Sequence, residues 1–165
     1  MRVVLALGSN LGDRFDTLRS ALDALFEKPG LTFVAVSPVY ETDPVGGPEQ
    51  GAYLNAVVIA ESALEPRELL DRAQGVENAF GRVRVERWGA RTLDVDLITV
   101  GDVAMDDPDL TLPHPRAHER AFVLVPWVRA DPGAVLSGHR AADLLAGLDQ
   151  GYVRPRPDLT LQRPV

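Results

Sequence analysis

The stretch Tyr53-Leu54-Asn55-Ala56-Val57-Val58-Ile59-Ala60 is rich in aliphatic and β-branched residues, which predicts a strand. It follows residues 41–52, whose Pro, Gly and acidic residues predict a long loop. It precedes residues 66–80, where apolar side chains recur at helical spacing and Pro66 suits the first turn of a helix. This strand therefore lies between a long loop and an amphipathic helix.

The same patterns extend outward on both sides. Residues 31–37 and residues 1–7 predict two further strands, and residues 13–26 between them form a helix with Asp13 as a suitable N-cap. Residues 92–100 predict a fourth strand. The resulting order βαββαβ indicates an α+β fold, a ferredoxin-like sandwich whose two helices pack on one face of a mainly antiparallel sheet.

The rest of the chain carries weaker patterns. Residues 106–120 are rich in Pro, Asp and His, which predicts irregular structure. Helices are expected over residues 119–129 and 140–148, and the Pro-rich tail after Gly151 is expected to be weakly ordered. Neither a repeat nor a linker interrupts the pattern, so residues 1–165 are expected to form a single domain.

Composition narrows the class of protein. The net charge of −7 argues against a nucleic-acid or anionic-membrane binder. The absence of cysteine, together with an apolar start too short for a signal peptide or a membrane span, predicts a cytoplasmic protein. The one lysine, Lys28, precedes Pro29, so nucleotide binding here does not use a P-loop. Nothing in the sequence demands an oligomer, and we expect a monomer.

The segment Leu93-Asp94-Val95-Asp96-Leu97-Ile98 carries the clearest chemical signal. In a strand, Asp94 and Asp96 point to the same side, and two adjacent carboxylates favour a cation between them. Mg²⁺ typically binds one or two carboxylates together with substrate phosphates. The alternative is a solvent-facing strand with two surface acids.

A cluster of arginines immediately precedes that strand. Four of the ten residues in 82–91 are arginine, in a chain that is acidic overall. Guanidinium groups match phosphate oxygens, so the cluster beside a pair of aspartates favours phosphoryl transfer.

Four further candidate residues each allow two interpretations. Trp88 in the same loop suits either a flap over a ligand or a core anchor. Gln74 and Glu77 share one face of a helix, which is either part of a functional site or a solvent-exposed surface. His114 either contacts phosphate or has a structural role.

Residues 87–97, Arg-Trp-Gly-Ala-Arg-Thr-Leu-Asp-Val-Asp-Leu, closely resemble the signature of the 6-hydroxymethyl-7,8-dihydropterin pyrophosphokinase family. Shorter matches follow in the family's order at residues 8–12, 40–42, 53–55 and 113–116. The resemblance covers roughly residues 1–130. It implies transfer of diphosphate from ATP to the hydroxymethyl group of the pterin, with release of AMP, in tetrahydrofolate biosynthesis.

The resemblance also implies roles for individual residues. Asp94 and Asp96 would hold two Mg²⁺ ions, and Arg82 and Arg91 would join them as catalytic residues. The positions implied to bind ATP are Leu70, Gln74, Glu77, Arg82, Arg84, Arg87, Trp88, Arg91, Leu97, Thr111, His114 and Arg120. The positions implied to bind the pterin are Thr42, Pro44, Val45, Tyr53, Asn55, Trp88, Asp94 and Phe122.

Among the pterin positions, Tyr53 and Phe122 would stack on the two faces of the flat ring, and Asn55 would read its amino-oxo edge. Without the resemblance, both aromatic residues fit an ordinary core equally well. Two positions depart from the family. The arginine-rich loop is one residue shorter than in some members, and Asp109 stands where some members have a basic residue near ATP.

Two other classes of function fit parts of the pattern. A palm-type nucleotidyl transferase or cyclase also sets paired aspartates on a ferredoxin-like sheet, but it would release pyrophosphate instead of AMP. A ferredoxin-like binding module would show no turnover and no effect of Asp96→Ala. The arginines beside Asp94 and Asp96 argue against the binding module, and the product separates the two enzymes. For the pyrophosphokinase we expect attack of the pterin hydroxyl on the β-phosphorus, assisted by two metals.

Overall fold

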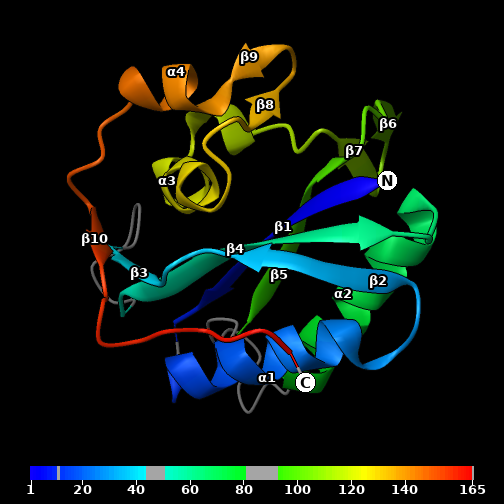
Figure 1. Ribbon diagram of the computed structural model, residues 1–165, viewed down its shortest axis with the longest axis horizontal. Helices are drawn as coiled ribbons and strands as arrows, with labels where there is room; N and C mark the ends of the chain where they lie inside the picture. The colour runs from blue at the N-terminus through cyan, green and yellow to red at the C-terminus, as the bar shows by residue number, and fades with distance from the viewer. Residues whose placement is uncertain (11, 44–50, 81–92, 165) are drawn as a thin grey trace.

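The computed structural model describes residues 1–10, 12–43, 51–80 and 93–164. Its main sheet is antiparallel throughout, with the strand order β10-β3-β4-β1-β5, and β2 also pairs with β4. The strands of this sheet are β1 (Arg2–Ser9), β2 (Leu31–Val36), β3 (Tyr40–Thr42), β4 (Tyr53–Ser62), β5 (Asp94–Val100) and β10 (Val153–Pro155). Figure 1 shows β4 and β1 crossing the middle of the molecule.

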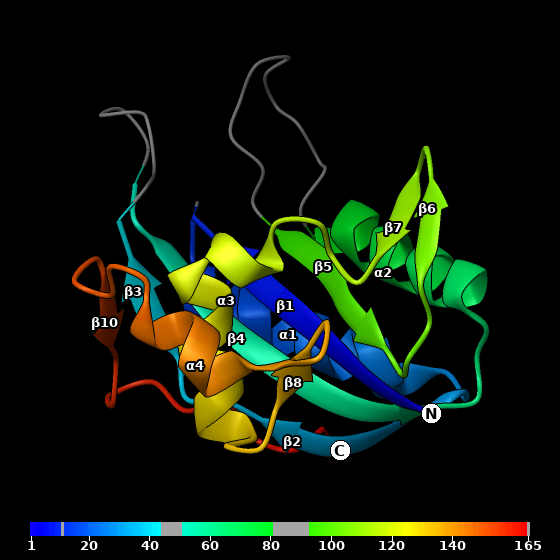
Figure 2. The same ribbon diagram turned by 90° about the horizontal axis from the view of Figure 1, so that it is seen from above.

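The helices cover both faces of this sheet. They are α1 (Arg14–Glu27), α2 (Pro66–Phe80), α3 (Ala121–Ala130) and α4 (Ala141–Ala146), with a short 3-10 helix η1 (Ala117–Glu119) before α3. Figures 1 and 2 show α1 and α2 on one face and α3 with α4 on the other. The order β1-α1-β2-β4-α2-β5 and the sheet order β5-β1-β4-β2 confirm the predicted ferredoxin-like fold, to which α3 adds a second helical layer.

The second layer explains why β4 is apolar on both sides. Alternate side chains of a strand point to opposite faces. On β4, Ala56 and Val58 belong to the core under α1 and α2, whereas Val57 and Ile59 belong to the core under α3. A strand covered on both faces has a continuous apolar run instead of an alternating one.

Helix α1 begins where the sequence predicts. The Asp13 side chain accepts a hydrogen bond from the backbone N–H of Asp16 at 3.0 Å, which caps the helix. The expected third helix starts two residues late as α3, because residues 117–119 form η1 first. The expected fourth helix is shorter than predicted, since β9 (His139–Arg140) occupies its first residue.

Several short strands lie where no strand was predicted, beginning with β3, because residues 41 and 42 were expected to belong to the long loop. The first residues of the 106–120 segment, which was expected to be irregular, belong to the hairpin of β6 (Met105–Asp107) and β7 (Leu110–Leu112). Strand β8 (Val135–Leu136) pairs with β9. The tail expected to be weakly ordered contains β10 and then packs Leu161 into the core, where that residue is 5% exposed. Strands of two or three residues carry no readable period, so sequence patterns miss them.

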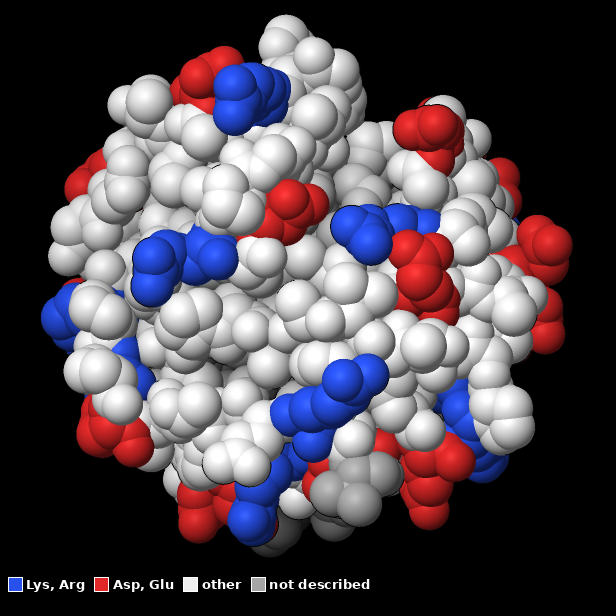
Figure 3. All heavy atoms as spheres, viewed as in Figure 1, with Lys and Arg blue, Asp and Glu red and all other residues white. Residues whose placement is uncertain are grey.

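Two observations concern the surface of the described residues. No helix among them is long and apolar enough to cross a membrane. On the face in Figure 3, basic and acidic side chains are interspersed with each other.

Candidate active site

A pocket of about 250 Å³ lies beside the end of β5 at which Asp94 begins the strand. Strands β1, β3, β4 and β5 contribute to its lining, as do the residues at the start of α3. Seven residues that the sequence indicated line it: Thr42, Tyr53, Asn55, Asp94, Asp96, Arg120 and Phe122. The lining also includes Asp43 and the β1 residues 6–8.

Asp94 and Asp96 point to the pocket side of β5, as the alternation of a strand requires. Both are half-buried, whereas Val95 and Leu97 between and after them are buried in the core under α1 and α2. Opposite them on β1 lie Gly8 and Ala6, whose small size leaves room above the sheet. A Cβ atom on Gly8 would come within 2.9 Å of the Asn55 amide nitrogen, so glycine there keeps Asn55 in place.

The donor atoms at Asp94 and Asp96 suit a hard divalent cation. Carboxylate oxygens are the ligands that Mg²⁺ prefers, and Mg²⁺ commonly completes its shell with water and substrate phosphates. Within residues 1–10, 12–43, 51–80 and 93–164, no group of three or more acidic, histidine or cysteine side chains is close enough to hold an ion alone.

Glu77, which the resemblance places in the nucleotide site, contacts the strand that carries the two aspartates. It is buried in α2, 6% exposed, and its Oε2 accepts a hydrogen bond from the backbone N–H of Val95 at 2.9 Å. That N–H lies between Asp94 and Asp96, so Glu77 fixes the part of β5 from which both carboxylates project. Gln74, expected on the same helix face, is exposed instead.

Thr42 and Asn55 form a buried polar contact at the edge of the pocket. The Thr42 hydroxyl donates to Asn55 Oδ1 at 2.6 Å, and both residues are less than 9% exposed. With its carbonyl oxygen engaged, Asn55 has its amide N–H₂ directed toward Gly8, where it lines the pocket. Tyr53 comes from the same strand and Phe122 from α3, and the Arg120 guanidinium lies 5.5 Å from the centre of the Phe122 ring.

Among the described residues, the other positions expected to bind the nucleotide do not line this pocket. Leu70 is half-buried on α2, Thr111 is half-buried on β7, and Leu97 is 5% exposed in the core. A salt bridge connects the two outer elements: Arg67 on α2 donates to Asp107 at 2.5 Å and to Asp109 at 2.6 Å. Asp109, the position at which the resemblance places a basic residue in some family members, is therefore the ion-pair partner of Arg67 on α2.

His114 is tied to β5 through the backbone. Its N–H donates to the Ile98 carbonyl at 2.8 Å, and its Nδ1 accepts from the backbone N–H of Arg116 at 3.2 Å. Burial lowers the pKa of the imidazole, and the nearby positive charges of Arg120 and Arg116 lower it further. His114 is therefore neutral at pH 7 and able to exchange hydrogen bonds, but not to supply a positive charge.

Seven of the sequence-indicated positions lie outside the described residues: Pro44, Val45, Arg82, Arg84, Arg87, Trp88 and Arg91. Sequence reasoning in turn missed Asp43, which lines the pocket next to Thr42. A signal was present, because Asp43 directly follows the family-like motif at residues 40–42. No sequence pattern indicated that β10 would pair with β3 beside this residue.

Comparison with known proteins gives consistent matches. Residues 4–132 match the family described as 7,8-dihydro-6-hydroxymethylpterin-pyrophosphokinase (HPPK). The chain is 48% identical over 184 residues to the 2-amino-4-hydroxy-6-hydroxymethyldihydropteridine pyrophosphokinase of Mycobacterium tuberculosis (strain ATCC 25618 / H37Rv), covering 99% of this chain and 96% of the relative. It is 45% identical over 122 residues to the Bacillus subtilis (strain 168) protein of the same name, covering 74% of this chain and 73% of the relative.

Solved structures agree on the fold. The HPPK-DHPS of Plasmodium falciparum, crystallised with pteroate, superimposes with a TM-score of 0.68 at 15% identity and covers 88% of this chain. This chain spans 42% of the length of that protein. At this identity the likeness concerns the fold alone.

Proposed function

The chain belongs to the 7,8-dihydro-6-hydroxymethylpterin-pyrophosphokinase family, and from that premise we infer that it transfers diphosphate from ATP to 6-hydroxymethyl-7,8-dihydropterin. The products are AMP and the pterin diphosphate, an intermediate of tetrahydrofolate biosynthesis. The main structural support for this inference is a single pocket. It is lined both by the paired carboxylates of β5 and by the aromatic and amide side chains suited to a pterin.

The acceptor is held by the part of the pocket formed by β3, β4 and α3. Tyr53 and Phe122 supply aromatic surface for the two faces of a bicyclic ring. The Asn55 amide, oriented by the Thr42 hydroxyl, supplies hydrogen bonds to the ring edge. By family resemblance, Pro44, Val45 and Trp88, which lie outside the described residues, also belong to the pterin positions, as does Asp94.

Asp94 and Asp96 would hold Mg²⁺, and the family resemblance implies two ions. Mg²⁺ bound there would neutralise charge on the phosphates of ATP and act as a Lewis acid. The protein's own part is positional, since Glu77 fixes the strand that carries both carboxylates. Arg120 adds a positive charge to the same pocket. Arg82, Arg84, Arg87 and Arg91 are assigned to the phosphates by family resemblance.

The nucleotide binds beside α2 and the β6–β7 hairpin. Gln74 and Thr111 present polar groups there, Leu70 presents an apolar surface, and neutral His114 presents a hydrogen-bonding ring. Leu97 supports this side from the core instead of from the surface. We further propose that the chain acts as a single domain, as a monomer, and in the cytoplasm.

A product assay tests the function. The wild-type chain is incubated with ATP, Mg²⁺ and 6-hydroxymethyl-7,8-dihydropterin, and AMP and pyrophosphate are measured separately. We expect AMP in amounts equal to the pterin diphosphate formed. Release of pyrophosphate instead would favour a nucleotidyl transferase or cyclase, and absence of both products would contradict an enzymatic role.

A further inference from the structure

The C-terminal segment lies against the acceptor side of the site. Strand β10 pairs with the outer edge of β3, with Arg154 opposite Glu41. Backbone hydrogen bonds extend the pairing at both ends, from the Asp43 N–H to the Tyr152 carbonyl and from the Arg156 N–H to the Val39 carbonyl. Beyond β10 the chain runs toward α1, and Leu161 is buried in the core there (Figure 1).

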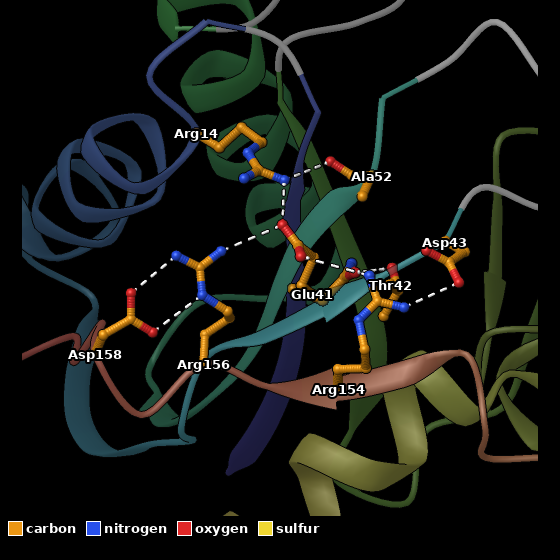
Figure 4. Close-up of polar contacts among 9 residues, drawn as sticks. Arg14, Glu41, Thr42, Asp43, Ala52, Arg154, Arg156 and Asp158 are labelled. Atoms are coloured by element: carbon orange, nitrogen blue, oxygen red, sulfur yellow. Dashed lines mark hydrogen bonds and ion pairs between the residues drawn. The ribbon is translucent and has the colours of Figure 1, made fainter.

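Three arginines converge on the Glu41 carboxylate, as Figure 4 shows. Arg14 donates to its Oε2 at 2.8 Å, and Arg156 donates to the same oxygen at 3.2 Å. Arg154 donates to Oε1 at 3.4 Å. The Glu41 side chain is 21% exposed, so these contacts are partly shielded from solvent. We call Glu41, Arg14, Arg154 and Arg156 the Glu41 cluster.

The Glu41 cluster holds both ends of the segment that joins β3 to β4. At the start of that segment, Arg154 donates to the Asp43 carboxylate at 2.9 Å. At its end, Arg14 donates to the Ala52 carbonyl at 2.8 Å with the same Nη1 atom that binds Glu41 (Figure 4). One carboxylate therefore connects the departure of the chain from β3 with its return to β4.

The position of β3 also determines where neighbouring pocket residues lie. Glu41 is followed by Thr42, which lies opposite Tyr53 and orients Asn55 through its hydroxyl. Asp43 lines the pocket as well, and its partner Arg154 offsets a third negative charge beside Asp94 and Asp96. The charges within the network balance, because Asp158 binds Arg156 through two hydrogen bonds.

We propose that the Glu41 cluster is a positioning device for the acceptor substrate, which sets β3 and both ends of the 43–52 segment so that Thr42, Tyr53 and Asn55 meet the pterin. The proposal rests on the proposed function for the identity of that substrate. It gives the C-terminal arginines a role in substrate recognition although neither of them lines the pocket. Loss of Glu41 would leave three guanidinium groups facing one another without their shared partner, which destabilises this arrangement.

The test compares Glu41→Gln with wild type in steady-state kinetics and in direct binding of the pterin by calorimetry. We expect the KM and Kd for the pterin to rise about tenfold, while kcat and the KM for ATP change by less than about threefold. Glu61→Gln is the matched control, because it removes an exposed carboxylate that pairs with Arg2 at 3.1 Å elsewhere on the sheet. That variant should leave both KM values unchanged.

A second variant, Arg154→Gln, keeps the test decisive if Glu41→Gln does not fold. It releases Asp43 while the contact between Arg14 and Glu41 remains, and a rise of about threefold in the pterin KM is expected. Equal changes in the two KM values, or a fall in melting temperature with an unchanged pterin KM, would overturn the proposal and make the cluster merely structural. Absence of AMP from the wild type would instead contradict the proposed function, and calorimetry with the pterin would still test the cluster.

Discussion

The two substrate sides of this molecule are built differently. The acceptor side rests on β3 and β4, where Thr42 and Asn55 are 3% and 8% exposed and bonded to each other. On the nucleotide side, α2 and the β6–β7 hairpin are joined by Arg67, Asp107 and Asp109, whose side chains are 46%, 45% and 63% exposed. Exposed ion pairs contribute little stability, whereas a buried polar group that loses its partner is costly. Buried hydrogen bonds therefore fix the acceptor side, whereas exposed ion pairs hold the nucleotide side more weakly.

The largest effect should come from the residues between the two sides. Asp94→Asn and Asp96→Asn remove the charge that we assign to metal binding and keep the shape of the side chain, so turnover should fall about 10³-fold with little change in melting temperature. AMP release at saturating substrates measures this. Asp102→Asn, an exposed acid in the turn after β5, is the control. Wild-type turnover in either pocket variant would remove the metal assignment.

Asn55→Ala should show how far the acceptor side depends on its buried contact. It removes a pterin contact and leaves the Thr42 hydroxyl without an acceptor, so the pterin KM should rise about 100-fold and unfolding should become about 1–3 kcal/mol easier. Kinetics and urea unfolding measure the two effects. Thr42→Val, which removes the hydroxyl alone, and the double variant complete a cycle in which the two effects should not add. An unchanged pterin KM would contradict the view that the buried contact between Thr42 and Asn55 shapes the acceptor side.

Glu77→Gln tests whether β5 is positioned by α2. The amide still accepts a hydrogen bond but loses the charge that strengthens the bond from Val95, so turnover should fall about tenfold with both KM values nearly constant. The matched control is Asp71→Asn, an exposed acid on the same helix. A change confined to the KM for ATP would instead make Glu77 a nucleotide contact.

Arg67→Gln should have a small effect if the nucleotide side is held by exposed contacts. The KM for ATP should rise less than about twofold, and the difference from wild type should shrink further in high salt because exposed charges are screened. Titration of ATP at low and high NaCl measures this. A tenfold loss would show that the salt bridge shapes the nucleotide site as firmly as β3 shapes the acceptor site.

The smallest expected effect concerns pH. His114 has a folded pKa below its ordinary value of 6.5, so its neutral form is the one that the fold favours. Its contribution to stability is present above pH 6.5 and is lost as the pH falls through the lower folded pKa. An NMR titration of the imidazole should give a midpoint below that of the unfolded chain. A midpoint above that of the unfolded chain would contradict the effect of burial on the pKa of His114.

Much of the fold and of the pocket could be predicted because long periodic segments and local motifs carry them. Strands β1, β4 and β5 and helices α1 and α2 follow from apolar spacing, and seven of the sequence-indicated residues line one pocket. Strand β10 could not be predicted, since it is three residues long and its Arg154 meets Asp43 from 111 residues away. The burial of Glu77 also escaped prediction, because it depends on the Val95 N–H of a strand that the helix pattern does not reveal.

Strand β5, which carries Asp94 and Asp96, is also the last strand in the order of its sheet. Strands in that position are prone to join the sheets of other molecules, and charged side chains near their backbone discourage such joining. We therefore expect the two aspartates also to discourage association of β5 with the sheets of other molecules. Replacing them with neutral residues risks insolubility at high protein concentration, apart from any loss of turnover.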